Sequence, residues 1–170
     1  MHFPLHPDTP AEGLSLEELF RGRTSDVRAA QARLHALMDA EGLSYGPRTH
    51  TYNSRLAQEL AKWAEAEPGG GAIHDALFEA YFVNNRNIGD AAVLVDIARS
   101  VGLPASEAAD VLRERRSRAG VDADWAKSRE YNVTGVPTFA SGGHMVVGAQ
   151  PYETLAQLLR QRKAMPRTER

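Results

Sequence analysis

The residues best placed to bind a ligand lie at 133–139, Val-Thr-Gly-Val-Pro-Thr-Phe, where a proline opens an apolar strand. Proline has no backbone N–H, so it cannot donate to the hydrogen-bond ladder of a sheet. A cis Val136–Pro137 peptide bond is one way to accommodate it. The N–H and C=O of Val136 would then face solvent as an unpaired strand edge, able to pair with an extended peptide. The alternative is a trans bond that merely kinks the start of the strand.

The residue types do not support thiol chemistry, a metal site, a serine nucleophile or a phosphate-binding loop. The sequence contains no cysteine, so it supplies no disulfide, thiolate nucleophile or cysteine-ligated metal centre. Its six histidines are scattered and form no His-Glu-x-x-His pair, so we predict no metal site and no catalytic residue. Neither a Gly-x-Ser-x-Gly motif nor a phosphate-binding glycine-rich loop after a strand occurs.

Length and composition indicate one ordinary globular domain. The chain has 170 residues, of which 42% are hydrophobic and 25% charged. A formal net charge of −2 excludes a general electrostatic attraction to nucleic acid, and the arginines at 113–118 are interpreted as a solvated helix face. No apolar run approaches the ~20 residues of a membrane helix, and the first residues do not resemble a secretion signal. We therefore predict a cytoplasmic protein with no membrane partner and no nucleic-acid partner.

Apolar periodicity and capping residues predict that residues 15–131 are almost entirely helical. Ser15 and Glu18 form a capping box for a short helix over 15–21. Further helices are expected to start at Ser25 or Asp26, near Asn53 and Ser54, and at Ala72, Asp90, Ser106, and Asp122 or Asp124, with Asn132 as the last helix stop.

Strands are predicted in three places only, near 1–6, 133–140 and 144–148. The first of these lies in a proline-rich segment and is expected to be at most a short edge strand. The other two form a hairpin through a glycine turn, and the final helix begins at Gln150 and Pro151.

Residues 135–139 (Gly-Val-Pro-Thr-Phe), the hairpin, and residues 148–151 (Gly-Ala-Gln-Pro) leading into a terminal helix resemble the C-terminal half of DsbA-type thioredoxin-fold proteins. The resemblance is greatest to the FrnE-like branch, near 2-hydroxychromene-2-carboxylate isomerases and kappa-class glutathione transferases. Residues 3–13, 52–57 and 77–90 resemble further segments of this family in the same order. The resemblance also favours the cis geometry at Val136–Pro137.

This resemblance implies an α/β thioredoxin-like (DsbA-type) fold in truncated form, with a small incomplete sheet and a large inserted all-helical subdomain. Residues 1–14 and 132–162 would form the incomplete core, and residues 15–131 the helical insertion. Residues 163–170 would form a frayed basic tail.

The sequence departs from the family at its catalytic element, a strand followed by a Cys-x-x-Cys helix, or by a serine in the isomerase and transferase branches. This sequence begins after that element, so dithiol exchange by the chain alone is excluded. The absent strand would be central in the sheet, and its loss leaves an open strand edge near 138–140. We expect a homodimer through this edge and the segment 2–5. The alternatives are direct pairing of that segment with the edge, or a longer protein that continues upstream.

Three functions follow from the resemblance. The first is a non-catalytic protein that binds an extended peptide or a glutathione-like ligand at Thr134, Val136 and Pro137. The second is a thiol-disulfide oxidoreductase or isomerase whose Cys-x-x-Cys element lies upstream of this chain. The third is a glutathione-dependent isomerase or transferase with Asn53 as a polar contact, although Asn53 also suits a helix N-cap. Apart from glutathione, no cofactor is expected.

Overall fold

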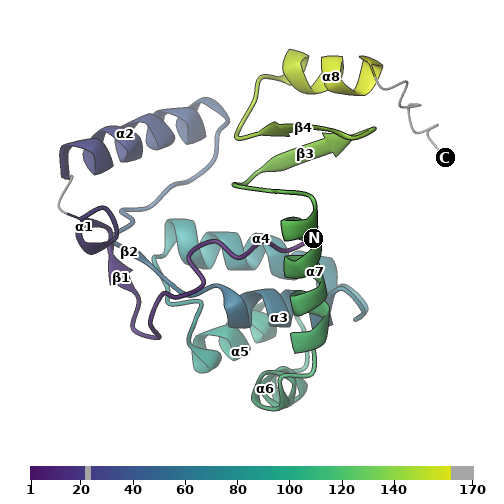
Figure 1. Cartoon of the computed structure of the whole chain (residues 1–170). Helices are drawn as coiled ribbons and strands as arrows, with labels where there is room; N and C mark the ends of the chain where they lie inside the picture. The colour runs from purple at the N-terminus through teal and green to yellow at the C-terminus, as the bar shows by residue number, and fades with distance from the viewer. Residues whose placement is uncertain (22–23, 162–170) are drawn as a thin grey trace.

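The computed structural model describes residues 1–21 and 24–161, with side chains described from residue 27 onward in the helix that begins at Thr24. Two separate two-stranded antiparallel sheets and a larger group of helices make up this part of the chain (Figure 1). The second sheet and the last helix lie together above the main helical group in the view of Figure 1. The expected frayed tail at 163–170 lies outside the described residues.

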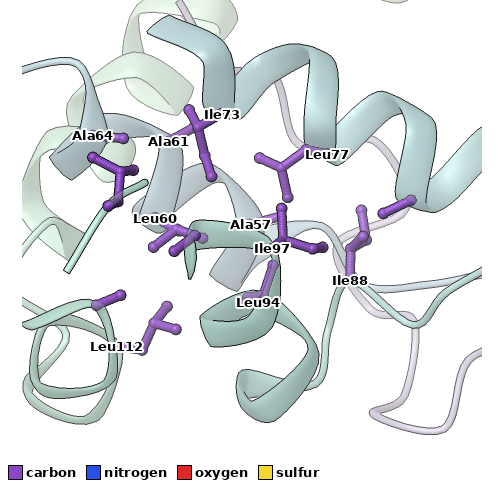
Figure 2. Packing of buried hydrophobic residues seen from close by; sticks show 14 residues of the cluster. Ala57, Leu60, Ala61, Ala64, Ile73, Leu77, Ile88, Leu94, Ile97 and Leu112 are labelled. Carbon is purple, nitrogen blue, oxygen red and sulfur yellow. The ribbon is translucent and has the colours of Figure 1, made fainter. Parts of the chain in front are cut away.

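The hydrophobic core lies among α3 (Arg55–Ala64), α4 (Ile73–Phe78), α5 (Ala91–Ser100), α6 (Ala105–Glu114) and α7 (Arg118–Glu130). Each helix except α7 contributes to one continuous cluster of buried side chains (Figure 2). Burial of these apolar side chains is the main force that holds the helices together. The largest fully buried apolar side chains are those of Leu60, Ile73, Leu94, Ile97, Val111 and Val121.

Local sequence signals explain several helix ends. The side chain of Asp90 accepts a hydrogen bond from the N–H of Ala92, which confirms the predicted cap of α5. Asn132 has a φ of 52° after α7, which confirms the predicted left-handed stop. A 3₁₀ turn, η1 (Gly70–Ala72), precedes α4, and a π-helical turn, η2 (Glu79–Val83), continues α4 to the end of the predicted helix.

Three predicted helix starts are wrong. Helix α2 (Thr24–Ala40) already contains Ser25 and Asp26. Helix α6 is preceded by Pro104, whose fixed φ suits the start of a helix, so Ser106 lies inside it. Helix α7 begins at Arg118, because the left-handed φ of 54° at Arg115 ends α6 and lets the chain turn at once into the next helix, which contains Asp122 and Asp124.

A short sheet joins the two ends of the α2 segment. β1 (Leu14–Ser15) pairs with β2 (His50–Thr51), and α1 (Leu16–Leu19) follows β1 directly. The capping box is confirmed, since the hydroxyl of Ser15 accepts from the N–H of Glu18 at 3.1 Å, and the Glu18 carboxylate accepts from the N–H of Ser15 at 2.9 Å. The prediction of strands only near 1–6, 133–140 and 144–148 is wrong at two places here, at β1 and at β2. Strand β2 forms because the connector after α2 runs extended past β1, where the N–H of Leu16 donates to the C=O of Thr49.

The predicted C-terminal hairpin and final helix are confirmed, but the strand predicted over 133–137 is wrong: these residues form a loop, and the strand begins after Pro137, which has no N–H to donate. β3 (Thr138–Ser141) pairs with β4 (His144–Val147), with Thr138 opposite Val147, and α8 (Tyr152–Gln161) packs on both strands. The turn uses Gly142 and Gly143, whose φ values of 53° and 78° lie in the left-handed region that favours glycine. Along the described chain, β3 has β4 as its one strand neighbour, so its other edge is open.

The predicted strand near 1–6 is wrong. This segment does not pair with β3 and instead runs as extended chain over α3, where the C=O of Phe3 accepts from the side-chain amide of Gln58 at 3.0 Å. The physical reason is that Pro4 removes a ladder donor, while α3 offers a polar side chain and an apolar face. Within the described residues, no helix is long and apolar enough to cross a membrane.

Candidate ligand-binding site

Residues 134–137, which we call the proline loop, are attached to the hairpin by two hydrogen bonds. The Val136–Pro137 peptide bond is cis, as expected from the family resemblance. The hydroxyl of Thr138 donates to the C=O of Gly135 at 2.6 Å, and the N–H of Gly148 donates to the C=O of Pro137 at 2.8 Å. Both strands of the hairpin therefore position the loop.

The backbone of Val136 is available to a ligand. Neither its N–H nor its C=O has a hydrogen-bond partner among the described residues, and the residue is 49% exposed. An extended segment placed alongside would satisfy both groups, as in the addition of a strand to an open sheet edge.

Val136 borders a mostly apolar cavity of about 370 Å³. Its walls come from the N-terminal segment, the face of α3 that carries Ala57 and Ala61, and α4 with η2. The small side chains of Ala57 and Ala61 leave space between these elements. Cavities of this size hold side chains or small ligands. The lining residues are Met1, His2, Phe3, Leu5, His6, Thr51, Tyr52, Ser54, Ala57, Gln58, Ala61, His74, Leu77, Phe78, Tyr81, Phe82, Ile88 and Val136.

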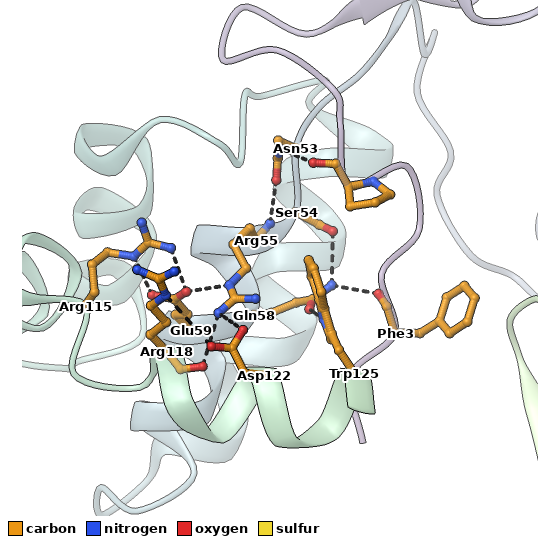
Figure 3. A network of polar contacts seen from close by, with 11 residues as sticks. Phe3, Asn53, Ser54, Arg55, Gln58, Glu59, Arg115, Arg118, Asp122 and Trp125 are labelled. Atoms are coloured by element: carbon orange, nitrogen blue, oxygen red, sulfur yellow. Dashed lines mark hydrogen bonds and ion pairs between the residues drawn. The ribbon is translucent and has the colours of Figure 1, made fainter. Parts of the chain in front are cut away.

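Gln58 fixes the N-terminal wall of this cavity (Figure 3). Its amide nitrogen donates to the C=O of Phe3 at 3.0 Å and to the hydroxyl of Ser54 at 3.1 Å. Its amide oxygen accepts from the indole N–H of Trp125, on α7, at 2.7 Å. One side chain thus connects the N-terminal segment, α3 and α7.

A second anchor holds the start of the chain. The backbone N–H of His2 donates to Asp124 Oδ2 at 3.1 Å, and Lys62 Nζ donates to the same oxygen at 3.1 Å. Burial would raise the pKa of Asp124, but these hydrogen bonds outweigh it and hold the pKa below its usual value. Burial lowers the pKa of the His2 imidazole, and the attraction of Asp124 offsets this effect only in part. The His2 imidazole at the cavity wall therefore loses its proton at a lower pH than an ordinary histidine.

The four predicted site residues have different surroundings. Val136 lines the cavity, and Pro137 follows it in the loop. Thr134 is exposed, and its hydroxyl has no hydrogen-bond partner within the described chain. Asn53 is outside the lining of the cavity. Its amide nitrogen donates to the C=O groups of Pro7 and Thr9 at 3.0 and 2.9 Å. Its oxygen accepts from the N–H of Arg55 at 3.0 Å (Figure 3).

Sequence reasoning missed Gln58 and the aromatic residues Tyr52 and Phe82 as parts of the cavity wall. Leu77, Tyr81 and Phe82 lie in a segment whose apolar periodicity predicts a helix, but periodicity does not distinguish a packed face from a cavity wall. Gln58 lies on the polar side of α3, in line with Ser54 and Lys62, so no signal in the sequence distinguished it from a solvated side chain.

A buried carboxylate stabilises the helices beside the site. Glu59 is 1% exposed and accepts two hydrogen bonds at 2.7 Å from the guanidinium of Arg115 and another from Arg55 (Figure 3). Burial alone would raise the pKa of Glu59, but these hydrogen bonds outweigh it and lower the pKa. Arg113 and Arg116 also pair with carboxylates, both of them with Glu114. The predicted solvated arginine face is therefore largely paired with acidic side chains.

In the described residues, no group of three or more histidine, aspartate or glutamate side chains is arranged to hold a metal ion. The site therefore consists of an open backbone edge beside an apolar cavity. Such a site can bind and orient an extended ligand. The sequence offers no thiol for covalent exchange.

Comparison with known proteins identifies the family of the chain. The family model described as DSBA-like thioredoxin domain matches residues 1–160. The protein YwbO of Bacillus subtilis (strain 168) is 32% identical over 102 residues, which cover 59% of this chain and 50% of YwbO. The chain thus matches about half the length of this curated relative.

Solved structures show the same fold. A probable DsbA oxidoreductase from Streptomyces coelicolor is 27% identical and superimposes with a TM-score of 0.85, over 99% of this chain and 76% of that one. A 2-hydroxychromene-2-carboxylate isomerase is 18% identical with a TM-score of 0.71, over 83% of this chain and 69% of that one. The expected DsbA-type thioredoxin-like fold, rich in helices and with little sheet, is confirmed.

Proposed function

The chain belongs to the DSBA-like thioredoxin domain family, and we propose that it is a non-catalytic member that binds an extended peptide or a glutathione-like ligand. The observation that carries this proposal is the unpaired backbone of Val136 beside a 370 Å³ apolar cavity. Disulfide exchange needs a thiolate, and the sequence contains no cysteine. In this proposal the chain keeps a binding surface but lacks the thiol that disulfide exchange requires.

The ligand would pair its backbone with the N–H and C=O of Val136 and place an apolar group in the cavity. The exposed hydroxyl of Thr134 lies two residues before Val136 and is a further polar contact. Asn53 would act indirectly, because its hydrogen bonds hold the loop at Pro7 and Thr9 that precedes β1.

Amide chemical shifts of the full chain test this proposal. We expect the tripeptide acetyl-Ala-Phe-Ala-amide, or reduced glutathione, to shift the amide signals of Thr134 and Val136 at millimolar concentration. The matched control is the same tripeptide with its central amide N-methylated, which removes the donor for the C=O of Val136 and should bind more weakly. The absence of any shift near Val136 with either ligand would overturn the proposal.

A second candidate is a thiol-disulfide oxidoreductase or isomerase whose Cys-x-x-Cys element is supplied from outside this sequence. It is favoured by the open edge of β3 and by the additional length of YwbO. An in-frame Cys-x-x-Cys segment encoded upstream of the Met1 codon would support it. The chain by itself should reduce insulin no faster than buffer containing the same thiol reductant, because it has no sulfur nucleophile. A glutathione-dependent isomerase or transferase is the third candidate, supported by its similarity to the isomerase fold.

We also propose that two copies associate through the open edge of β3 and the segment 2–5. Phe139 on this strand is 38% exposed, and an open edge with apolar side chains favours pairing. Light scattering across a dilution series should show a dimer that dissociates on dilution. Phe139→Lys should shift the protein toward monomer, whereas Leu159→Lys on α8 should not. A monomer at micromolar concentration in the unmodified protein would contradict the proposed dimer.

We propose that the protein is located in the cytoplasm and that it has no nucleic-acid partner. The ion pairs of Arg113 with Asp110 and of Arg116 with Glu114 support the absence of a nucleic-acid partner, since each of these cations already has a carboxylate partner. Fractionation of cells that express the full protein tests the location, and a gel-shift titration with duplex DNA tests binding.

A further inference from the structure

A second cavity, of about 640 Å³, lies between α2 and the helix formed by α4 and η2. It is separate from the proposed peptide site, although the two share Phe78 and Phe82 as lining residues. Helical spacing explains this arrangement, because 74, 77 and 81 face one cavity and 75, 79 and 83 face the other. The aliphatic part of the lining of the second cavity comes from Leu34, Met38, Leu43 and Val83.

Aromatic rings dominate one wall of this cavity. The ring of Phe82 stacks on Tyr45 with centroids 6.5 Å apart and lies 6.1 Å from Phe78. Phe78 is 59% exposed, so its ring is accessible to a ligand in this cavity. The faces of such rings carry negative electrostatic potential and attract cations.

Two carboxylates lie at the same cavity. Asp75 and Glu79 are four residues apart on one helix, and neither forms an ion pair within the described residues. The nearby cation Arg48, 6.0 Å from the Phe82 ring, does not line this cavity and is held by Tyr81 and the C=O of His50. The cavity therefore combines an apolar, aromatic interior with uncompensated negative charge.

We propose that this cavity binds a small organic cation with an apolar body, such as an arylalkyl ammonium. Its ammonium group would lie between Asp75 and Glu79, and its apolar part would contact the rings of Tyr45, Phe78 and Phe82. The cavity volume falls in the range typical of small-molecule sites. An anion of the same shape would be repelled, and a neutral molecule would lose the charge interactions.

Three soluble probes of matched shape test this proposal on the full chain: 4-phenylbutylamine, 4-phenylbutanol and 4-phenylbutyrate. Amide shifts should concentrate at Tyr45, Glu79 and Val83, which line this cavity and not the other, and affinity should fall in the order ammonium, alcohol, carboxylate. We expect the ammonium to bind roughly tenfold more tightly than the alcohol, given the combined carboxylate and ring interactions.

The double variant Asp75→Asn with Glu79→Gln should abolish this preference and leave binding of the alcohol unchanged. The matched control is Asp110→Asn with Glu114→Gln on α6, which removes the same net charge away from the cavity and should leave the preference intact. Thermal unfolding verifies that each variant is folded. Equal affinity for the amine and the alcohol, an unchanged preference in the Asp75 and Glu79 variant, or shifts confined to the Val136 site would overturn the proposal. Because the probes report on a different cavity, the result does not depend on whether a peptide binds at Val136.

Discussion

The indole N–H of Trp125 donates to the side-chain oxygen of Gln58 at 2.7 Å and so orients the amide group whose nitrogen holds the C=O of Phe3. This relationship between α7 and α3 determines where the N-terminal segment lies, and with it one wall of the cavity beside Val136. If residues 1–6 formed a strand, the C=O of Phe3 would instead accept a hydrogen bond from a neighbouring strand.

Replacing Gln58 with alanine should release the N-terminal segment. The change removes hydrogen bonds to Phe3 and Trp125, at a cost of about 1–2 kcal/mol in the free energy of unfolding. Hydrogen exchange should accelerate at the amide of Leu5, which donates to the C=O of Phe3. The control Gln31→Ala, which removes a hydrogen bond to the C=O of Arg48, should not affect exchange at Leu5. Unchanged exchange in the Gln58 variant would mean that other contacts hold the segment.

Replacing Glu59 with glutamine should destabilise the protein more than the same change at Glu114. Glu59 is buried between Arg55 and Arg115, so its loss leaves Arg115 without its charge partner and Arg55 with only the more exposed Asp122, at a cost of about 2–4 kcal/mol. Glu114 is half exposed and pairs with two exposed arginines, so Glu114→Gln should cost less than about 1 kcal/mol. Urea unfolding of both variants measures the difference, and equal costs would contradict the assigned role of Glu59.

Alanine should be tolerated at Gly71 and not at Gly70. A Cβ atom at Gly70 would lie 1.7 Å from the C=O oxygen of Ala64, so the backbone between α3 and α4 must move. We expect Gly70→Ala to cost about 1–3 kcal/mol, as other overpacking substitutions do. A Cβ at Gly71 meets no atom within 4 Å, so Gly71→Ala should change stability by less than about 0.5 kcal/mol. A comparison of melting temperatures tests both expectations.

The stability of the protein should increase with pH as His2 loses its proton. The pKa of the folded-state imidazole lies below the ordinary value of 6.5, so the unfolded chain binds the proton more readily. The resulting penalty is complete below the folded-state pKa and disappears as pH rises above the unfolded-state pKa. NMR titration of the His2 ring should give a midpoint below 6.5, and Asp124→Asn should lower it further by removing an attractive charge. A midpoint at or above 6.5 would contradict the burial of this side chain.

The features that the sequence by itself determined are those set by residue type or by neighbours in the chain. The lack of cysteine excludes thiol chemistry whatever the fold. The capping box of Ser15 with Glu18 and the cap at Asp90 form within three residues, so they depend little on the rest of the protein. The hairpin after Pro137 likewise follows from a local glycine turn. The resemblance of the chain to a family was recognisable because these local signals occur in a characteristic order.

Only the tertiary structure decided which distant groups meet. Arg115 and Glu59 are 56 residues apart, and their pairing required a left-handed turn at Arg115 that no local signal indicates. The placement of the N-terminal segment on α3, in place of the predicted strand, depended on a hydrogen bond between residues 55 positions apart. Both cavities arise from the way helices pack. Periodicity identifies an apolar face, but the space left between two such faces depends on the shapes of side chains from elements far apart in the chain.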